Sequence, residues 1–378
     1  MERPGNLAEI ISKFKVNVIL ASVREFGTGH INDTYHLKDI EPARPGYLLQ
    51  RINHHVFKDV NGLMHNILLV TNYLRSQIKV LHYTDPEQKV LRLVQTEDDA
   101  YYYKDNEGVY WRMYHYLANT SSYDIVTTEK QAYEGGKAFG MFQAMLSDLH
   151  AELLTATIPN FLNMEKRLEA FEWAVSSDIC GRAAEVADHI RFVRERATEM
   201  CYFQSPGAIK LLPLRVTHND TKFNNVLLNQ KDEAQCVIDL DTVMPGYVAY
   251  DFGDAVRSII STAAEDEADL EKIKLNIPLF KAFAEGYFKE AYSFITPVET
   301  DSLIKGVLLL PYMQSVRFLT DYLEGDQYYK IHFPGHNLQR TNAQMQLVRE
   351  LENHTEELSS IINQVQQTFN IKNKQYES

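Results

Sequence analysis

The sequence predicts an α+β protein of two lobes, a small β-rich N-lobe (residues 1–117) and a larger, mostly helical C-lobe (residues 118–378). Three observations support this prediction. The chain has 378 residues, which is more than one compact core usually serves. Strand-like runs fill its first third, and helical periodicity dominates after about residue 118. One β-hairpin signal, at residues 225–241, interrupts the helical part.

The N-lobe is expected to hold strands and one helix. Two β-prone runs within residues 17–39 are joined by a glycine-containing turn, and residues 46–52 read as a third strand. Residues 59–77 carry apolar side chains at helical spacing. Residues 89–117 then supply two further strands around an Asp-Asn-Glu-Gly turn at 105–108. These elements amount to a small sheet with one accompanying helix.

The C-lobe begins with threonine capping residues followed by a helical pattern. Helices are expected over residues 127–150, 163–177, 181–203, 251–263, 269–293, 300–324 and 341–368. A short strand within residues 214–220 precedes the hairpin. The hairpin therefore lies between two runs of helices.

Composition narrows the function classes. The chain is 45% hydrophobic and 24% charged, with a formal net charge of −13, which is typical of an ordinary globular protein and disfavours nucleic-acid or acidic-membrane binding. Its three cysteines show no CxxC spacing, which favours a reducing compartment. The N-terminus lacks a signal-peptide core, and no apolar run approaches the ~18 residues of a membrane helix. We therefore expect a cytoplasmic protein.

The hairpin region carries the strongest chemical signal. Asp220 lies two residues after His218 and five before Asn225, which is the H-x-D-x-x-x-x-N spacing of kinase catalytic loops. In that pattern the aspartate positions the attacking hydroxyl as catalytic base, and the asparagine holds a metal ion. Asp239 follows an apolar run nineteen residues after Asp220, the distance that one hairpin requires. We expect Asn225 and Asp239 to hold Mg²⁺.

A second candidate for the metal ligand is Asp251, the first residue of the tripeptide Asp-Phe-Gly that binds metal in protein kinases. It lies thirty-one residues after Asp220, too far to be on the next strand of the same hairpin. It also begins a predicted helix, where aspartate is a good N-cap. We therefore expect Asp251 to be a cap or a loop anchor, and not the metal ligand.

The stretches VTHNDTKFNNVLL (residues 216–228) and VIDLDTVMPGYVAYDFGD (residues 237–254) resemble the aminoglycoside phosphotransferase and choline kinase superfamily. The segments DLDTVMPG and RFLTDYLEGD are narrower and resemble the N-acetylhexosamine 1-kinases. Supporting stretches span residues 27–341. The resemblance implies a protein-kinase-like bilobal fold. It also implies transfer of the γ-phosphoryl group of ATP to the anomeric hydroxyl of N-acetylglucosamine or N-acetylgalactosamine.

Further site residues follow from the patterns together with the resemblance. The first strand turn, with Gly27, Gly29 and Asn32, is expected to cover the nucleotide phosphates through backbone N–H groups. Gln50 lies on the strand where protein kinases place a phosphate-binding lysine, and the helix over 59–77 has no glutamate to form the usual Lys–Glu pair. Tyr114 falls at the expected inter-lobe hinge, whose backbone would bind the purine.

The resemblance assigns sugar contacts to five residues: His30, Asp241, Thr242, Arg317 and Tyr328. For Asp241 and Thr242 a hydrogen-bonded turn is an equal alternative. Arg317 and Asp321 are four apart on a predicted helix, so a salt bridge between them is the structural alternative.

Other functions stay open. One is another kinase of the same superfamily that acts on an amino alcohol, homoserine or an aminoglycoside. A second is a non-catalytic binding module with a kinase fold, which the complete set of Asp220, Asn225 and Asp239 disfavours. The sequence leaves open the preferred hexosamine, ATP or GTP, the pathway and the oligomeric state, for which a monomer is compatible.

Overall fold

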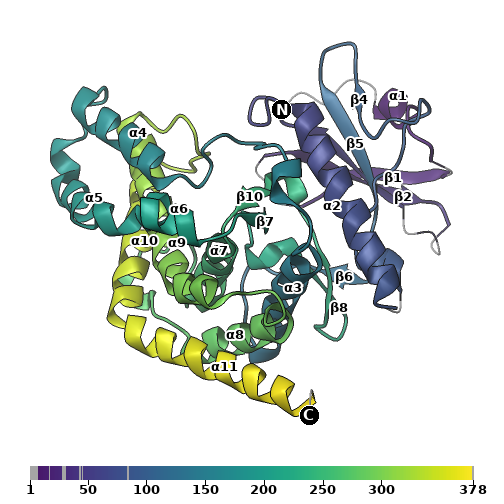
Figure 1. The fold of residues 1–378 in the computed structure, drawn as a ribbon. Helices are drawn as coiled ribbons and strands as arrows, with labels where there is room; N and C mark the ends of the chain where they lie inside the picture. The colour runs from purple at the N-terminus through teal and green to yellow at the C-terminus, as the bar shows by residue number, and fades with distance from the viewer. Residues whose placement is uncertain are drawn as a thin grey trace. The chain divides into compact units, whose positions relative to one another are not determined.

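The computed structural model describes residues 7–376, except residues 17, 28–30, 42–43, 45 and 83–84, with side chains up to residue 369 (Figure 1). Contacts divide the chain into two compact units. The N-terminal unit comprises Met1–Ser121, Asp148–Pro159 and Leu227–Pro245. The helical unit comprises Ser122–Ser147, Asn160–Val226 and Gly246–Ser378. Each unit is described separately.

A five-stranded antiparallel sheet forms the centre of the N-terminal unit, with strand order β1-β2-β3-β5-β4. Its strands are β1 (Leu20–Glu25), β2 (Asp33–Asp39), β3 (Tyr47–Ile52), β4 (Tyr103–Lys104) and β5 (Tyr110–His115). Leu37, Leu49 and Met113 point from three adjacent strands into one apolar core, which α1 (Leu7–Ile11) also joins. Because side chains alternate along a strand, the residues between them face the opposite side.

Helix α2 (Val60–Val80) begins at its cap Asp59, whose side chain accepts a hydrogen bond from the Gly62 N–H. A smaller sheet joins β6 (Thr120–Ser121), β8 (Val226–Asn229) and β9 (Ala234–Val237). Asn66 of α2 donates to the Val243 carbonyl at 2.9 Å and to the Thr155 carbonyl at 2.7 Å. Buried polar contacts thus fasten α2 to the segment that follows Asp239.

The helical unit contains most of the helices (Figure 1). They are α3 (Glu129–Met145), α4 (Met164–Ser177), α5 (Ala187–Met200), α6 (Pro206–Leu211), α7 (Val248–Ile260), α8 (Ile277–Ala291), α9 (Pro297–Leu323), α10 (His336–Asn353) and α11 (Thr355–Tyr376). Strand β7 (Arg215–Thr217) precedes the candidate catalytic loop, and β10 (Met244–Gly246) spans the point where the chain passes between units.

Glycines allow two helix pairs of this unit to approach closely. A Cβ at Gly136 of α3 would lie 2.0 Å from the Phe283 carbonyl oxygen of α8. A Cβ at Gly306 of α9 would lie 2.0 Å from the Ala249 carbonyl oxygen of α7. Only a residue without a side chain fits at these crossings. Around them, Phe252 and Tyr287 pack edge to face with ring centroids 5.0 Å apart.

Most predicted elements are present, with shifted ends. Helix α7 begins at Val248, and its N-cap is Tyr247, so the prediction that Asp251 caps this helix is wrong. Helix α8 starts at Ile277 after the cap Asn276, later than the predicted residue 269. The predicted helix over 341–368 is two helices, α10 and α11, separated at His354.

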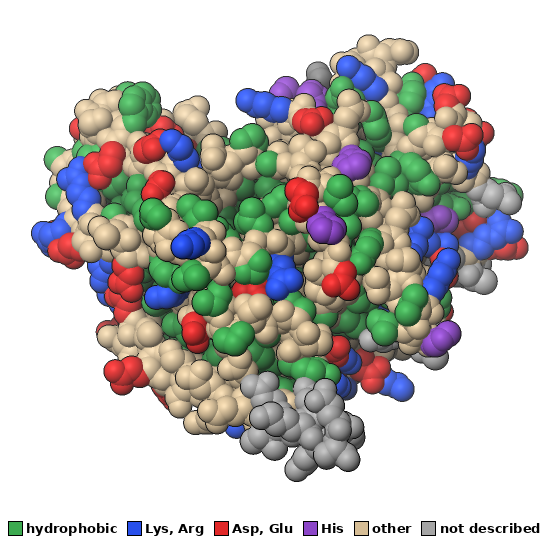
Figure 2. All heavy atoms as spheres, in the orientation of Figure 1, with side chains coloured by type: hydrophobic (Ala, Val, Ile, Leu, Met, Phe, Trp, Pro, Cys, Tyr) green, Lys and Arg blue, Asp and Glu red, His purple; other side chains and the backbone are tan. Residues whose placement is uncertain are grey.

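Charged side chains of both signs are interspersed over the face drawn in Figure 2. That face presents no continuous basic surface, in keeping with the net charge of −13. Among the described residues, no helix combines the length and the apolar character that crossing a membrane demands.

Gly306→Ala should lower the free energy of unfolding by about 1–3 kcal/mol, because the added methyl group overlaps the backbone of α7 and must push the helices apart. Urea titration followed by far-ultraviolet circular dichroism measures this. Gly207→Ala is the matched control: a Cβ there meets nothing within 4 Å, so the change should be neutral or stabilise by about 0.4–1 kcal/mol. Equal effects at both positions would contradict the close crossing of α7 and α9.

Candidate functional site

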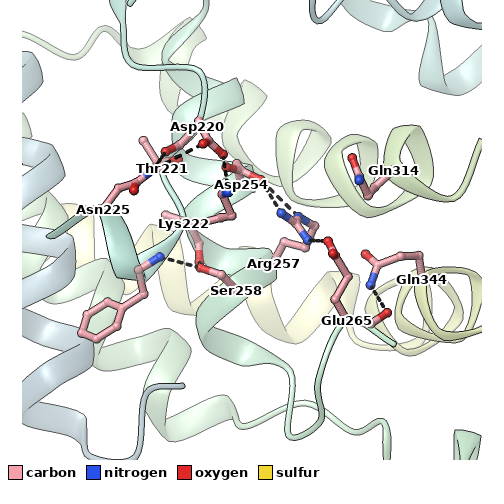
Figure 3. A network of polar contacts seen from close by, with 12 residues as sticks. Asp220, Thr221, Lys222, Asn225, Asp254, Arg257, Ser258, Glu265, Gln314 and Gln344 are labelled. Carbon is pink, nitrogen blue, oxygen red and sulfur yellow. Dashed lines mark hydrogen bonds and ion pairs between the residues drawn. The ribbon is translucent and has the colours of Figure 1, made fainter. Parts of the chain in front are cut away.

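The candidate catalytic loop connects β7 to a 3-10 turn at Phe223–Asn225 (Figure 3). The Asn225 amide nitrogen donates to the Asp220 carbonyl oxygen at 2.8 Å and to its Oδ2 at 3.3 Å. The structure therefore brings the predicted base and the predicted metal ligand into contact. The Asp220 side chain stays 25% exposed, so that a substrate hydroxyl could reach it.

The backbone of this loop adopts a conformation that few residues tolerate. Asn219 has φ of 63°, in the left-handed region where asparagine is favoured among residues with a side chain. Its side chain accepts from the Thr217 hydroxyl at 3.0 Å. A Cβ at Gly246 would lie 2.3 Å from that hydroxyl, so glycine is required beside the loop. The local sequence thus fixes how Asp220 is presented.

Asp251 anchors the loop from the first turn of α7. One carboxylate oxygen accepts from the His218 N–H at 2.9 Å and from Gln143 Nε2 at 2.8 Å, and the other accepts from the Asn219 N–H at 2.7 Å. Burial raises the pKa of Asp251, while His218 and these donors favour its charged form. Of the two predicted roles, a cap or a loop anchor, the structure shows the loop anchor.

A chain of charges extends from Asp220 across the helical unit (Figure 3). Lys222 Nζ lies 3.3 Å from Asp220 Oδ1. The buried Asp254 carboxylate accepts from Arg257 Nε and Nη2 at 3.1 and 2.9 Å, and Arg257 Nη1 reaches Glu265 at 2.6 Å. Burial raises the pKa of Asp254, an effect that Arg257 opposes and the nearby Asp220 reinforces. The cation Lys222 therefore sits where it offsets the negative charge of Asp220.

A second polar cluster lies within the N-terminal unit and centres on Arg112. The Arg112 side chain is 2% exposed, and its Nη1 lies 2.6 Å from Asp241 Oδ1. Arg112 Nε donates to Gln50 Oε1 at 3.0 Å, because the register of β3 and β5 sets these two residues opposite each other. Asn32 Nδ2 donates to Asp241 Oδ2 at 2.7 Å. Two predicted site residues, Gln50 and Asp241, thus share the unpredicted partner Arg112, and a third, Asn32, joins the cluster through Asp241.

The turn that carries Asp239 is held by this cluster. Asp239 has φ of 60°, and the 3-10 turn Leu240–Thr242 follows it, so Asp239 and Asp241 do not alternate as strand residues. The Asp241 carbonyl accepts from the Thr157 hydroxyl at 2.9 Å, and its carboxylate is taken by Arg112 and Asn32. The Arg112–Asp241 pair, from β5 and this turn, therefore lies beside Gln50, on the strand where protein kinases carry a phosphate-binding lysine.

The remaining predicted residues have varied environments. Gly27 has φ of +82°, a conformation that glycine adopts without strain, whereas Gly29 and His30 lie outside the described residues. Tyr114 and Thr242 are buried. The expected contacts of Gly27 with the nucleotide phosphates and of the Tyr114 backbone with the purine stay predictions.

Arg317 and Tyr328 lie in the helical unit. The salt bridge between Arg317 and Asp321, which was the structural alternative to a sugar contact, is not formed: Asp321 instead accepts from the backbone N–H groups of residues 327, 328 and 329 and from Asn337. Arg317 Nη1 donates to Gln314 Oε1 at 3.0 Å. Tyr328 is 65% exposed. Arg317 is therefore left without a carboxylate among the described residues.

Sequence reasoning missed Arg112 and Lys222. Lys222 carried a readable signal, since it lies two residues after the candidate base in the same motif. Arg112 carried none by itself, because its partnership with Gln50 and Asp241 depends on strand register and on a contact 129 positions along the chain.

Comparison with known proteins connects this geometry to a family. Residues 22–287 match the phosphotransferase enzyme family. The chain is similar in structure to an aminoglycoside phosphotransferase from Alicyclobacillus acidocaldarius, at 13% identity and a TM-score of 0.62, over 97% of this chain and 98% of that one. It is also similar to choline kinase from Cryptosporidium parvum, at 14% identity and a TM-score of 0.57, over 95% and 99% of the two chains.

A third similar structure is a spectinomycin phosphotransferase in complex with ADP and spectinomycin, at 11% identity and a TM-score of 0.57, over 93% of this chain and 99% of that one. At such identities the likeness shows the fold. It confirms the predicted α+β class, a small sheet-rich lobe with a larger helical lobe of the protein-kinase-like kind.

Asp251→Asn should destabilise the protein by about 3 kcal/mol, because one oxygen that accepts N–H groups becomes an amide that points donors at donors. The activity should fall, yet its magnesium midpoint should stay unchanged. Asp239→Asn should do the reverse, raising the magnesium midpoint with little loss of stability. Thermal unfolding and magnesium titration of activity measure both.

The control for Asp251→Asn is Asp188→Asn, at a helix-surface carboxylate that is 82% exposed. It should leave stability and midpoint unchanged. A magnesium midpoint that shifts for Asp251→Asn but not for Asp239→Asn would reverse the assignment of the two aspartates.

Arg112→Met should lower the free energy of unfolding by about 3–5 kcal/mol, because Asp241 would keep a buried charge without its cation. Arg112→Met combined with Asp241→Asn should recover a large part of that loss. Urea titration followed by the fluorescence of Trp111, which is 1% exposed in the same unit, measures both. Arg24→Met, at an exposed position of β1, is the matched control. A double variant no more stable than the single one would show that the pair is not coupled.

Proposed function

Because the chain belongs to the phosphotransferase enzyme family, we propose that it transfers the γ-phosphoryl group of ATP to the anomeric hydroxyl of an N-acetylhexosamine. The main support for phosphoryl transfer is the contact between Asp220 and Asn225. Both lie in an accessible loop that the buried carboxylate of Asp251 anchors. The acceptor rests on the sequence resemblance of DLDTVMPG and RFLTDYLEGD to N-acetylhexosamine 1-kinases.

Asp220 is assigned to hold the acceptor hydroxyl and take its proton. Phosphoryl transfer passes through a loose transition state, so alignment of that hydroxyl matters more than the strength of the base. The anchored loop backbone keeps the Asp220 carboxylate in one place. Lys222, 3.3 Å from Asp220, would bring positive charge to the transferred group.

The side chains assigned to Mg²⁺ are Asn225 and Asp239. The donor set fits this ion, which prefers oxygen ligands. Asn225 directs its amide nitrogen to Asp220, so that its amide oxygen has no donor among the described residues and is available to a cation. The ion would offset charge on the phosphate oxygens of the nucleotide.

Nucleotide contacts are assigned to Gly27, Gly29, Asn32, Gln50 and Tyr114. Arg112 is added to this set as a positioning residue. Its Nε orders the Gln50 amide, and its Nη1 pairs with Asp241 in the turn after Asp239. In this reading the Arg112–Asp241 pair takes the organising place of the Lys–Glu pair of protein kinases.

Sugar contacts are assigned to His30, Thr242, Arg317 and Tyr328. Asp241, first expected to contact the sugar, is reassigned to positioning because Arg112 and Asn32 occupy its carboxylate. An amino alcohol or aminoglycoside acceptor is the rival proposal, since the similar structures include a choline kinase and aminoglycoside phosphotransferases. The unpaired guanidinium of Arg317 disfavours a cationic acceptor. The accessible Asp220 disfavours a binding module without catalysis.

Asp220→Asn should lower kcat by about 10²–10⁴-fold with the sugar and nucleotide dissociation constants nearly unchanged, because it removes the base and keeps the shape. Release of acid-labile sugar 1-phosphate, measured over a panel of N-acetylhexosamines, amino alcohols and aminoglycosides, tests the reaction. Near-normal kcat in a folded variant would contradict the role of Asp220. Turnover of an amino alcohol or aminoglycoside without any sugar 1-phosphate would support the rival acceptor class.

A further inference from the structure

Two arginines meet beside one aromatic residue of the helical unit. Helices α4 and α9 pack together and carry Arg167 and Arg317, respectively. Arg167 Nη2 donates to the backbone carbonyl of Phe161 at 2.8 Å, and the Arg317 guanidinium carbon lies 5.7 Å from the centre of the Phe161 ring. Both side chains are half-buried. Two positive charges are therefore gathered around Phe161.

Neither arginine has a carboxylate within ion-pair distance among the described residues. Two other partly buried arginines of this unit do: Arg215 lies 2.9 Å from Glu299, and Arg196 lies 2.7 Å from Glu352. The acid nearest in sequence to Arg317 on its own helix, Asp321, is buried and engaged with backbone N–H groups. Arg167 and Arg317 are thus two neighbouring cations without a paired acid in an acidic protein.

The hydrogen-bonding capacity of the two guanidiniums is largely unused. Arg167 Nε is buried without a hydrogen-bond partner. The partners that Arg317 has are the side chain of Gln314 and two aromatic rings. A buried donor left without a partner costs about 1–3 kcal/mol, which a ligand that supplies the acceptor would recover.

Electrostatics agree with this geometry. Burial lowers the pKa of Arg167, and the charge of Arg317 lowers it further, which means that each guanidinium is held against the repulsion of the other. A bound anion would favour the charged form of Arg167 and so oppose both effects. Guanidinium groups form paired, parallel hydrogen bonds with carboxylate and phosphate oxygens.

The surroundings keep Arg317 in a fixed orientation. Its guanidinium carbon lies 5.5 Å from the Tyr329 ring centre and 5.7 Å from the Phe161 ring centre. The Tyr329 N–H is bound by Asp321, which holds the loop after α9 in place. Stacking between rings limits the directions in which the guanidinium can donate. The two rings therefore restrict the directions from which an oxyanion could approach the Arg317 guanidinium.

We propose that Arg167 and Arg317 form an oxyanion subsite, and that the acceptor of this kinase carries an acidic substituent, a carboxylate or a phosphate, in addition to the hydroxyl that is phosphorylated. This inference rests on the proposed function for the identity of the acceptor as a sugar. It adds Arg167 to the acceptor site and changes the expected acceptor from a neutral to an anionic N-acetylhexosamine.

The test compares three probes: N-acetylglucosamine, its C6 carboxylate (N-acetylglucosaminuronic acid) and its 6-phosphate. For each, isothermal titration without nucleotide gives Kd, and formation of the sugar 1-phosphate gives KM and kcat. The wild type should bind one of the two acidic sugars about 10–100-fold more tightly than the neutral sugar, the range expected for charge-assisted hydrogen bonds. Which acidic sugar gains the affinity distinguishes a carboxylate from a phosphate.

Arg167→Gln should abolish most of that preference by raising KM for the acidic sugar, with kcat and the KM for ATP nearly unchanged. Arg167→Lys should restore only part of it, because lysine keeps the charge and loses the paired donors. Arg191→Gln, at a helix-surface arginine that is 66% exposed, is the matched control and should change nothing. Thermal unfolding checks that each variant is folded.

Two outcomes separate this inference from the proposed function. Sugar 1-phosphate formed equally well from neutral and acidic probes, with no change in Arg167→Gln, would overturn the oxyanion subsite and leave the sugar kinase standing. Failure of all three sugars as acceptors, together with tight binding of an acidic sugar that Arg167→Gln abolishes, would overturn the proposed reaction and support the subsite.

Discussion

The carboxylate of Asp251 is buried in the first turn of α7 and binds the backbone of the loop that carries Asp220. Two of its hydrogen bonds come from consecutive N–H groups, those of His218 and Asn219, and the third comes from Gln143. Because the Tyr287 hydroxyl donates in turn to Gln143 at 2.6 Å, the loop is tied through one chain of buried polar groups to α3 and α8. A buried charge is costly unless it is fully hydrogen-bonded, so these elements must assemble together for the loop to be formed. The close glycine crossings of the same helices serve this constraint, since they bring the bonded groups within reach.

A comparable device organises the N-terminal unit. There the ion pair between Arg112 and Asp241 joins strand β5 to the turn after Asp239, and Asn32 and Gln50 satisfy further atoms of the pair. In each unit the carboxylate of a second aspartate, Asp251 for Asp220 and Asp241 for Asp239, is engaged in structural contacts. That second carboxylate fixes the backbone segment that presents the candidate reactive carboxylate. This division explains why the segment from 218 to 254 is rich in aspartate without every aspartate being a ligand.

The sequence was sufficient for what depends on local pattern. Helix α3 begins after its predicted cap Thr128, whose hydroxyl accepts from the Gln131 N–H, and the turn at 105–108 separates β4 from β5 as expected. The spacing of Asp220 and Asn225 sufficed because both lie in one short loop. Contacts between segments that are far apart in the sequence could not be predicted from local pattern. The contact of Arg112 with Asp241 depends on strand register, and the role of Asp251 depends on where α7 begins. Neither the strand register nor the start of α7 can be deduced from local pattern alone. Aspartate is a good N-cap by residue type, yet α7 starts at Val248, and the Asp251 carboxylate binds the loop backbone instead.

Local arrangements of cations would allow a chain with a net charge of −13 to bind the phosphate compounds that the proposed function requires. Lys222 lies beside Asp220 and is 41% exposed, whereas Arg112 on β5 is buried and Arg317 lies near aromatic rings, where a charge acts more strongly than in water. They differ in how they are compensated. Lys222 and Arg112 each have a carboxylate at hand, so they are stable without a ligand and organise the site. Arg167 and Arg317 have none among the described residues and lie close together, so an arriving anion would gain from both charges. The presence or absence of a nearby carboxylate therefore distinguishes the cations that stabilise the protein from those that we propose bind an anion.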